Sequence, residues 1–534
     1  MKKKTLILLG FSALFFAEVQ AQTLTMVKDI YPTGDSGLKN LTLLNGDALF
    51  VANDGVNGRE LWKTDGTTGG TVLLKDINPN GNSHISEMKV IGNKMYFQAD
   101  NDTHGIELWV TDGTAAGTIM LKDIHTTGHS EPANFLGFNG KVYFSADDGI
   151  NETELWVTDG TEAGTNMLIN INTKAIGYGA SNPTNLTVMG TNFYFMATDG
   201  VHGYELWKSD GTAAGTIMVK DIQTGSFNSN PDRLYVFDSK LYFRASEYTN
   251  GPELWVSDGT EAGTIMLKDI NTDSGIGSYP GNFIKMNNEL FFTADGGNGT
   301  GFELWKTNGT AAGTVLVKDI KPTGSSSANS FILHNNLLYF TADNGTDGEE
   351  LWISNGTEAG TVTLKNINPT AGSDPFAYHV FQNEVYFRAK DGVSSAELWK
   401  TNGTAAGTVK ITDASLQIMN PLGNTFGFVE INNELFFSAR YNLTGDALWK
   451  LGGLVGVETL ENNVGIKLYP NPAHDVLTID SDSPIAVSLM NIHGQVLNTF
   501  PNNVNHQVDV SNLSQGIYLI NVNQGQQVHR FVKE

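Results

Sequence analysis

The sequence predicts an all-β protein: a closed β-propeller of about nine four-stranded blades, followed by a small β-sandwich domain. Three observations lead to this prediction. All nine tryptophans lie in one recurring motif, at spacings of 47 to 51 residues, and a fixed period of this length is typical of repeat architectures. Each unit contains four short β-rich runs separated by turn residues, with no helical period. The repeat stops after Leu451, where the composition changes.

Residues 1–21 are expected to be a signal peptide rather than part of the fold. Three lysines precede an apolar stretch from Leu6 to Phe16, and small residues stand before a cleavage point between Ala21 and Gln22. The apolar stretch is too short to span a bilayer comfortably. We therefore expect an exported chain that is soluble afterwards and has no membrane span.

The repeating unit is built around a Leu-Trp pair, which follows a glutamate in eight of the nine copies. A two-residue turn joins the first two runs of every unit, from Asn45-Gly46 in the first to Asn432-Asn433 in the last. Most of these pairs tolerate positive φ, as tight hairpins require. Four antiparallel strands in about 47 residues is the size of a propeller blade. The tryptophans are Trp62, Trp109, Trp156, Trp207, Trp255, Trp305, Trp352, Trp399 and Trp449.

The two ends of the array predict that the ring closes. Residues 25–30 form a fourth strand that precedes the first complete unit, and the motif around Trp449 has no fourth strand after it. Joining these ends completes the ninth blade, whereas an open solenoid would need distinct capping repeats. Two smaller rings are the alternative, although no linker interrupts the period.

The motif resembles the bacterial ELWxxDGT repeat family. It is clearest at residues 60–67 and 107–114, and the resemblance covers roughly residues 24–450. It implies a secreted or surface repeat protein, but no established activity. The ninth unit departs from the family pattern, with Ala447 in place of the glutamate.

A linker at residues 452–463 leads to a different module at residues 464–534. Its Leu-Tyr-Pro-Asn-Pro stretch, its Gly-Ile-Tyr-Leu-Ile strand and its terminal Phe-Val-Lys-Glu resemble a type A sorting domain of the type IX secretion system. The resemblance implies a small β-sandwich that interacts with the secretion machinery and directs passage from the periplasm across the outer membrane of a Bacteroidetes-type bacterium. The cargo is then released or attached to surface lipopolysaccharide. An ordinary terminal β-domain for binding is the alternative. The motif residues are Tyr469, Pro470, Asn471, Pro472, Gly516 and Tyr518.

Composition excludes several classes of function. The chain has no cysteine, so disulfides, cysteine-ligated zinc and thiol catalysis are excluded. Its formal net charge of −24 repels phosphate backbones and anionic lipids, so nucleic acid and membrane partners are not expected.

No catalytic, metal or cofactor site is predicted. The histidines form no metal-ligand motif, and His125 and His129 are read as loop residues because their spacing has no meaning outside a helix. The turn after each tryptophan carries Asp in early units, such as Asp112, but Asn in later ones, such as Asn308. Turn formation tolerates this exchange, whereas a calcium site would lose charge. Glu60 is expected to pair with Lys75 across its hairpin.

A candidate binding face is predicted where the repeats vary. The loop between strands two and three and the crossover to the next blade open on the same face, and they hold nearly all the variation. Aromatic residues there are the candidates for ligand contact; the alternative is that they plug the blade tops. They are Tyr178, Phe227, Tyr279, Phe376 and Tyr378.

We therefore expect a monomeric, non-catalytic binding or adhesion scaffold, secreted or displayed on the cell surface, with a glycan or a surface protein as its ligand. Two alternatives are a propeller hydrolase or lyase acting on polysaccharide, which would need carboxylates converging on the channel, and a structural component of a surface layer.

Overall fold

The computed structural model describes residues 24–533, apart from residues 175, 176, 178, 274, 394, 395, 413–415, 419–427, 442–444, 453–466, 492–495 and 523–526. The expected signal peptide, the cleavage point at Ala21 and Gln22, and Tyr178 lie outside the described residues. Two compact units are present, and the first along the described chain spans Leu24–Leu451. Every regular element in the described ranges is a strand, and none of them contains a helix able to cross a membrane.

Eight four-stranded antiparallel sheets make up blades 1 to 8, with the strands of each in sequence order. Blade 1 comprises β2 (Lys39–Leu44), β3 (Asp47–Asn53), β4 (Arg59–Thr64) and β5 (Val72–Lys75); blade 2, β6 (Ser86–Ile91), β7 (Lys94–Asp100), β8 (Ile106–Thr111) and β9 (Ile119–Lys122); blade 3, β10 (Ala133–Phe138), β11 (Lys141–Asp147), β12 (Thr153–Thr158) and β13 (Asn166–Ile169); and blade 4, β14 (Thr184–Met189), β15 (Asn192–Thr198), β16 (Tyr204–Ser209) and β17 (Ile217–Lys220).

The second half of the ring repeats this arrangement. Blade 5 comprises β18 (Asp232–Phe237), β19 (Lys240–Glu247), β20 (Gly251–Ser257) and β21 (Ile265–Lys268); blade 6, β22 (Gly281–Met286), β23 (Glu289–Asp295), β24 (Phe302–Thr307) and β25 (Val315–Lys318); blade 7, β26 (Asn329–His334), β27 (Leu337–Asp343), β28 (Glu349–Ser354) and β29 (Val362–Lys365); and blade 8, β30 (Phe376–Phe381), β31 (Glu384–Ala389), β32 (Glu397–Thr401) and β33 (Val409–Lys410).

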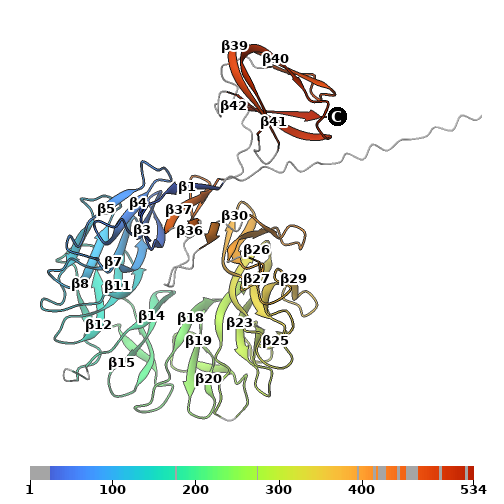
Figure 1. Cartoon of the computed structure of the whole chain (residues 1–534). Helices are drawn as coiled ribbons and strands as arrows, with labels where there is room; N and C mark the ends of the chain where they lie inside the picture. The colour runs from blue at the N-terminus through green and yellow to red at the C-terminus, as the bar shows by residue number, and fades with distance from the viewer. Residues whose placement is uncertain are drawn as a thin grey trace, which may run out of the picture. The chain divides into compact units, whose positions relative to one another are not determined.

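The ninth blade joins the two ends of the ring, as the sequence predicted. Strand β1 (Leu24–Lys28) pairs with β37 (Asp446–Leu451), so that Leu24 lies opposite Leu451 and Met26 opposite Trp449. Strand β36 (Glu434–Tyr441) continues the sheet, and β34 (Leu416–Ile418) and β35 (Val429–Ile431) both pair with it. The fold is therefore a closed β-propeller, whose sheets surround a central opening with β1 beside β37 (Figure 1).

Turn chemistry and packing between blades explain why this sequence adopts the ring. In six of the nine predicted hairpin turns both residues have positive φ, as in Asn45 (53°) and Gly46 (95°), which matches the right-handed twist of the flanking strands. The cores lie between neighbouring sheets. Trp255 of blade 5, for example, shares one cluster with Tyr194 and Leu206 of blade 4. Each blade thus buries its apolar face only against its neighbours, as repeat proteins do.

The second unit is a small β domain. Its five-stranded sheet contains β38 (Lys467–Tyr469), β39 (Val476–Asn491), β40 (Val496–Asp509), β41 (Gly516–Val522) and β42 (Gln527–Lys533). The long strand β39 pairs with both β40 and β41. Leu477, Val508 and Phe531 lie in its buried core, so this unit has a core of its own.

Candidate ligand-binding face

The candidate binding face that the sequence predicts is formed by loops that are hydrogen-bonded to one another. The crossover from blade 4 to blade 5 ends at Ser229, whose N–H donates to the carbonyl of Tyr204 in blade 4 (3.1 Å). The carbonyl of the same serine accepts the N–H of Ser246 in blade 5 (2.7 Å). Each crossover of this kind therefore fixes the loops of two adjacent blades in one position, which gives a ligand a rigid surface.

A buried glutamate anchors each of the seven crossovers that follow blades 1 to 7. Glu205, in the Glu-Leu-Trp motif of blade 4, is fully buried. Its carboxylate accepts hydrogen bonds from the Ile222 N–H (2.8 Å) and from the hydroxyl (2.6 Å) and N–H (3.1 Å) of Ser229. Burial raises the pKa of Glu205 to about 7, although these hydrogen bonds act to lower it. The corresponding glutamates are Glu60, Glu107, Glu154, Glu253, Glu303 and Glu350, each bonded to the isoleucine N–H at the start of its crossover.

The expected pairing of Glu60 with Lys75 is therefore wrong. A bulge between Leu61 and Trp62 shifts the register, so that Lys75 lies opposite Leu61, and Glu60 turns inward to accept the N–H of Ile77 (2.7 Å). The lysines at this position point across to the next blade instead. Lys122 Nζ donates to the carbonyl of Thr165 (2.6 Å), and the same contact recurs from Lys220, Lys268, Lys318 and Lys365.

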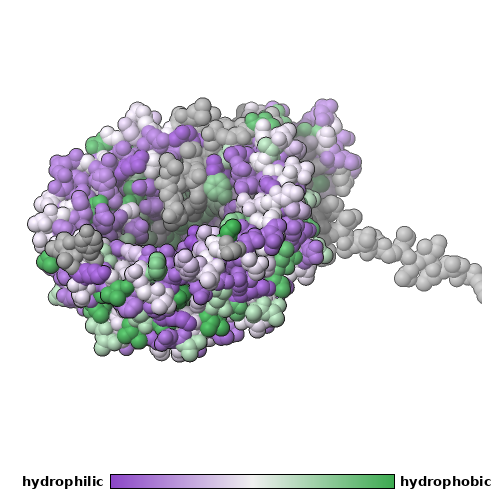
Figure 2. Space-filling model, turned by 90° about the horizontal axis from the view of Figure 1, so that it is seen from below, coloured by the Kyte–Doolittle hydropathy of each residue, from purple (hydrophilic) through white to green (hydrophobic). Residues whose placement is uncertain are grey.

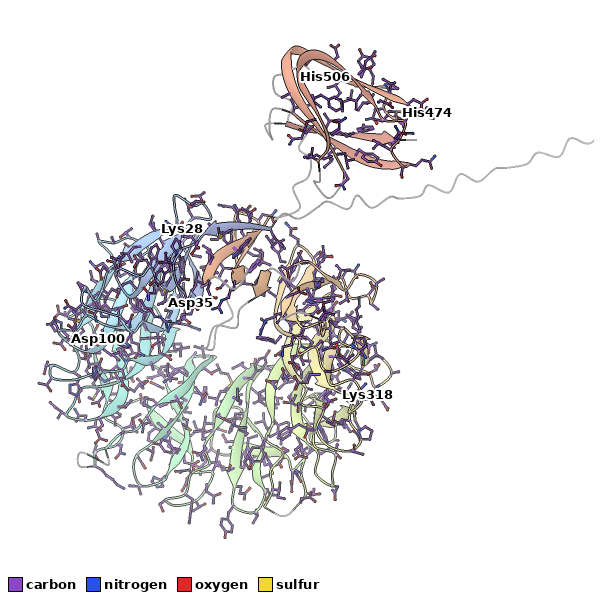
Figure 3. The ribbon with its side chains drawn as sticks, viewed as in Figure 1. Lys28, Asp35, Asp100, Lys318, His474 and His506 are labelled. Atoms are coloured by element: carbon purple, nitrogen blue, oxygen red, sulfur yellow. The ribbon has the colours of Figure 1, made fainter. Side chains whose placement is uncertain are left out.

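The closing seam repeats these inter-blade contacts. Lys28 of β1 donates to the carbonyl of Thr71 in blade 1 (2.7 Å), as its counterparts do elsewhere in the ring. Ser36, in the crossover that follows, donates to the carbonyl of Asp446 (2.6 Å). With Ala447 in place of the buried glutamate, an ion pair between Arg440 and Asp35 (2.6 Å) ties the crossover to blade 9. Figure 3 shows Asp35 on the inner side of the ring, beside the closing blade.

Arg440 also contacts a second carboxylate, that of Asp446 (3.2 Å). Burial raises the pKa of Asp446, as does the nearby Asp35 carboxylate, while Arg440 lowers it. This pair of acids is specific to blade 9. Both are bound by the same guanidinium, and Asp35 also accepts the N–H of Gly37 (2.9 Å), so the cluster is explained by its position at the seam.

The opposite face is made of uniform turns in which Asp and Asn form the same bonds. Asp112 Oδ1 accepts the N–H (2.9 Å) and the hydroxyl (2.7 Å) of Thr114. Asn308 Oδ1 makes the equivalent bonds at 3.1 and 2.7 Å. This equivalence supports the turn interpretation of these positions. Within the described ranges, no three His, Asp or Glu side chains gather in a group able to hold a metal ion.

The two loop histidines take different positions. The backbone N–H of Ile106 lies 2.9 Å from His129 Nδ1, so this ring helps to hold its crossover. The His125 ring is covered closely by Gly128 and Gly149. Neither arrangement requires a metal.

The four described aromatic candidates fall into two groups. Phe227 (62% exposed) and Tyr279 (45% exposed) lie on the crossovers before and after blade 5. Phe376 and Tyr378 belong to strand β30, where Arg388 lies over the Phe376 ring (4.7 Å) and the Tyr378 hydroxyl bonds to that of Thr341 (2.8 Å). The first group is open to a ligand, whereas the second group is engaged within the blades.

The structure adds residues that the sequence analysis did not select. Tyr248 is 82% exposed on the loop between the second and third strands of blade 5. The sequence carried a signal, because the corresponding position in the other described loops is glycine, or aspartate in blade 2. Exposed apolar residues also stand at the loop tips of other blades: Val56, Ile150, Val201 and Val393. Figure 2 shows a hollow at the centre of the ring and a largely hydrophilic surface with separate hydrophobic residues.

The first part of the sorting motif lies where the beginning of the second unit contacts its last strand, β42. The Asn471 side chain accepts the N–H of Val532 (2.9 Å), and Ala473 N–H donates to the carbonyl of the same residue (2.7 Å). Tyr518 stacks on Phe531 with ring centroids 5.7 Å apart. Gly516 begins the strand that carries this tyrosine, whereas Tyr469 stays exposed beside Pro470 and Pro472.

A comparison of families identifies this unit. Residues 467–534 match the secretion system C-terminal sorting domain. The protein is exported across the outer membrane. Such domains mark proteins that reach the cell surface or the medium by the type IX secretion system. The exported protein carries the propeller as its larger unit, and the family match does not extend to it.

Comparisons of whole chains find distant likenesses. No curated protein matches the sequence. Among solved structures, puromycin hydrolase is 12% identical with a TM-score of 0.37, over 76% of this chain and 60% of the hydrolase. Oligopeptidase B from Leishmania major is 10% identical with a TM-score of 0.36, over 74% and 53%. The extracellular domain of a putative one-component system from B. thetaiotaomicron is 10% identical with a TM-score of 0.29, over 93% and 86%. The chain thus spans little more than half of puromycin hydrolase and of oligopeptidase B, and such distant likenesses carry no information on activity.

Proposed function

We propose that the exported propeller is a non-catalytic binding scaffold whose variable loop face recognises a glycan or a surface protein. The supporting observation is the contrast between the two faces. On one face the turns repeat with the same hydrogen bonds in every unit from blade 1 to blade 8. On the other, loops of different sequence are held by a recurring framework of buried glutamates and crossover serines, whose carboxylate–hydroxyl bond is present after blades 2, 3, 4, 5 and 7. A fixed framework that carries variable loops is typical of recognition sites.

The rival function is a polysaccharide hydrolase or lyase. Its best candidates for acid and base are Asp35 and Asp446, which share Arg440. A glycosidase needs two carboxyl groups that are free to reach opposite sides of a glycosidic bond. The engagement of both carboxylates with one guanidinium at the ring seam favours a structural role for them. The binding function is therefore preferred, with the surface-layer component as a third candidate.

The test uses the mature exported chain on arrays of glycans and of purified outer-membrane proteins, with released reducing sugar measured in parallel. We expect saturable binding without sugar release. Sugar release that disappears in Asp446→Asn would establish the hydrolase instead. Absence of any ligand, together with ordered two-dimensional assembly of the protein on cells, would establish the surface-layer role.

A further inference from the structure

Blade 5 departs from the repeat at three loop positions that meet in space. The first lies two residues before the crossover serine. It carries glycine or alanine at Gly34, Gly81, Gly128, Gly179, Gly324 and Ala371, but Phe227 and Ile276 in the two crossovers that flank blade 5. The equivalence is structural as well, because the carbonyl of Phe227 approaches Gly203 of blade 4 as that of Gly81 approaches Gly58 in blade 1.

The second position is the turn between the second and third strands. Elsewhere the turn residue is glycine or aspartate, as in Gly55, Asp102, Gly149, Gly200, Gly297, Gly345 and Gly392, whereas blade 5 has Tyr248. In several other blades an Asp or Asn at the strand end caps this turn, as Asp147 does by accepting the N–H of Gly149 (2.7 Å). Blade 5 has Ser246 at that strand end and presents an exposed tyrosine at the turn.

The third position follows the crossover serine and has positive φ in every described copy. Its other occupants are Gly37, His84, Glu131, Asn182, Asn230, Ser327 and Asp374; blade 5 is followed by Tyr279, with φ 48°. A bulky residue in this conformation is a strained outlier. Strain of this kind gathers at functional sites because the side chain is needed there.

Hydrogen bonds bring these aromatic residues together around one strand pair. The Ser246 N–H donates to the carbonyl of Ser229 (2.7 Å), two residues after Phe227. Ser246 itself lies two residues before Tyr248 and pairs with Pro252. The carbonyl of Pro252 accepts the N–H of Tyr279 (3.0 Å). Each of the three aromatic residues is therefore at most two residues along the chain from a residue that belongs to the Ser246–Pro252 pair or is hydrogen-bonded to it. Two residues of extended chain span about 7 Å.

The surroundings of this cluster are polar, and the cation beside the rings is paired with a carboxylate. Arg244 lies 5.9 Å from the Tyr279 ring centre, but its charge is neutralised by Asp232, with which it forms an ion pair. The loops that carry the rings supply amide and hydroxyl groups from Asn228, Asn230, Thr249 and Asn250. They also supply carboxylates from Glu247, beside Tyr248, and from Asp273, in the crossover that leads to Tyr279. Exposed ring faces beside amide, hydroxyl and carboxylate groups match an uncharged sugar, whose C–H bonds pack on the electron-rich ring face while its hydroxyls bond to the polar groups around it.

We propose that Phe227, Tyr248 and Tyr279, with Ile276, form the binding site for a neutral oligosaccharide over blade 5. The inference rests on the proposed binding function and specifies its site and its ligand class. A protein partner fits less well, because a stable protein interface covers about 800 Å² on each side, far more than four side chains provide. An acidic polysaccharide fits less well because the chain carries a net charge of −24.

The test replaces the aromatic residues by the residues that the repeat uses elsewhere. The triple variant Phe227→Gly, Tyr248→Gly, Tyr279→Asn is compared with Val56→Ala, Val393→Ala, which removes exposed apolar groups from the same face in blades 1 and 8. Neutral glucan, xylan and mannan hexasaccharides are titrated by calorimetry, with polygalacturonate and alginate as acidic comparisons. We expect at least one neutral oligosaccharide to bind, with at least tenfold weaker binding in the triple variant and unchanged binding in the control.

Two further readouts keep the outcomes distinct. Tyr279→Asn alone should retain or raise the melting temperature, because it relieves a strained backbone, while it weakens binding; loss of folding in this variant would contradict the strain argument. Equal binding by the triple variant and the wild type would overturn this site but leave the binding function intact. Binding of acidic polymers alone, or of a protein alone, would overturn the ligand class, and no binding at all would count against both proposals.

Discussion

The buried glutamates are the residues on which the variable face depends. Glu205 receives four hydrogen bonds from the crossover to blade 5 while lying in the core. One side chain thus replaces the strand pairing that an irregular segment cannot make, and it satisfies donors that would otherwise be buried without partners. The crossover can then vary in sequence without losing its anchor.

Truncating this side chain should therefore be costly. In Glu205→Ala, the N–H groups of Ile222 and Gln223 lose their acceptor, while Ser229 keeps only the carbonyl of Tyr204. Each buried unsatisfied donor costs about 1–3 kcal/mol. We expect a loss of about 2–4 kcal/mol in the free energy of unfolding, measured by denaturant titration. Glu162→Ala, at an exposed turn position of blade 3, is the control and should change stability by less than about 0.5 kcal/mol. Similar effects of the two variants would show that the anchor contributes little.

The same glutamates predict how stability depends on pH. Burial raises the pKa values of Glu60, Glu154 and Glu205 to about 7 in the folded ring, against an ordinary value of 4.5. A group whose pKa is raised on folding stabilises the fold fully below its unfolded pKa, and this contribution is lost as pH rises through the folded pKa. Between pH 4.5 and pH 8 the melting temperature should therefore fall as pH rises, and Glu205→Gln should show a smaller dependence. A melting temperature that rises over this window would contradict the assignment.

At the scale of the element, one turn explains the most regular part of the sequence. The Asp in Asp-Gly-Thr binds the Thr backbone and hydroxyl, and that hydroxyl accepts the N–H of a glycine three residues on. The carboxylate lies against this glycine so closely that a Cβ on Gly70 would stand 2.0 Å from Asp65 Oδ1. The neighbouring Gly69 has nothing within 4 Å of such an atom.

These adjacent glycines give a matched pair of variants. Gly70→Ala should destabilise the protein by about 2 kcal/mol or more, because the new Cβ overlaps the carboxylate. Gly69→Ala should be neutral or stabilise it by about 0.4–1 kcal/mol, since Ala fits there and restricts the unfolded chain; Ala116 and Ala163 occupy the same place in other units. Thermal unfolding of both variants tests the turn. Equal effects would mean that the turn is looser than its hydrogen bonds indicate.

Strand number, turn positions and ring closure could be predicted because they depend on local residues: the positive-φ pairs, the period of the tryptophans and the unpaired strand at residues 25–30. The partner of Glu60 could not be predicted, because the bulge beside Trp62 does not change the alternation of polar and apolar residues in the sequence. A one-residue shift in pairing reverses the face of the sheet that a side chain occupies. Tyr248 lies on the loop between the second and third strands of blade 5, whereas the five predicted aromatic residues all lie in segments predicted to be crossovers. Phe376 and Tyr378 were selected as loop residues, whereas strand β30 begins earlier than the sequence pattern indicated.

At the scale of the whole molecule, β1 holds the ring closed. Val27 is buried (3% exposed) between blades 9 and 1, whereas the adjacent Met26 is 46% exposed on the same strand. Val27→Asp should therefore expose an unpaired edge of β37 and promote aggregation, while Met26→Asp should leave a monomer of normal stability. Light scattering and melting temperature distinguish the two outcomes. A monomeric, stable Val27→Asp protein would show that the ring does not depend on closure.

Export should depend on the folded sorting domain and not on the ring. The ring residues Leu24–Leu451 and the sorting domain form separate compact units, so unfolding the domain should leave the propeller folded. Leu477 is fully buried in the core of the domain, whereas the adjacent Val476 is exposed. In a bacterium with the type IX system, Leu477→Asp should leave the full chain in the periplasm with a folded ring. Val476→Asp should still reach the surface or the medium, with its first residue at Gln22 and its last before about residue 464. Mass spectrometry of both termini and protease protection of the ring measure these outcomes. If Leu477→Asp is exported as well as Val476→Asp, the machinery reads a short linear segment of the domain and not its folded surface.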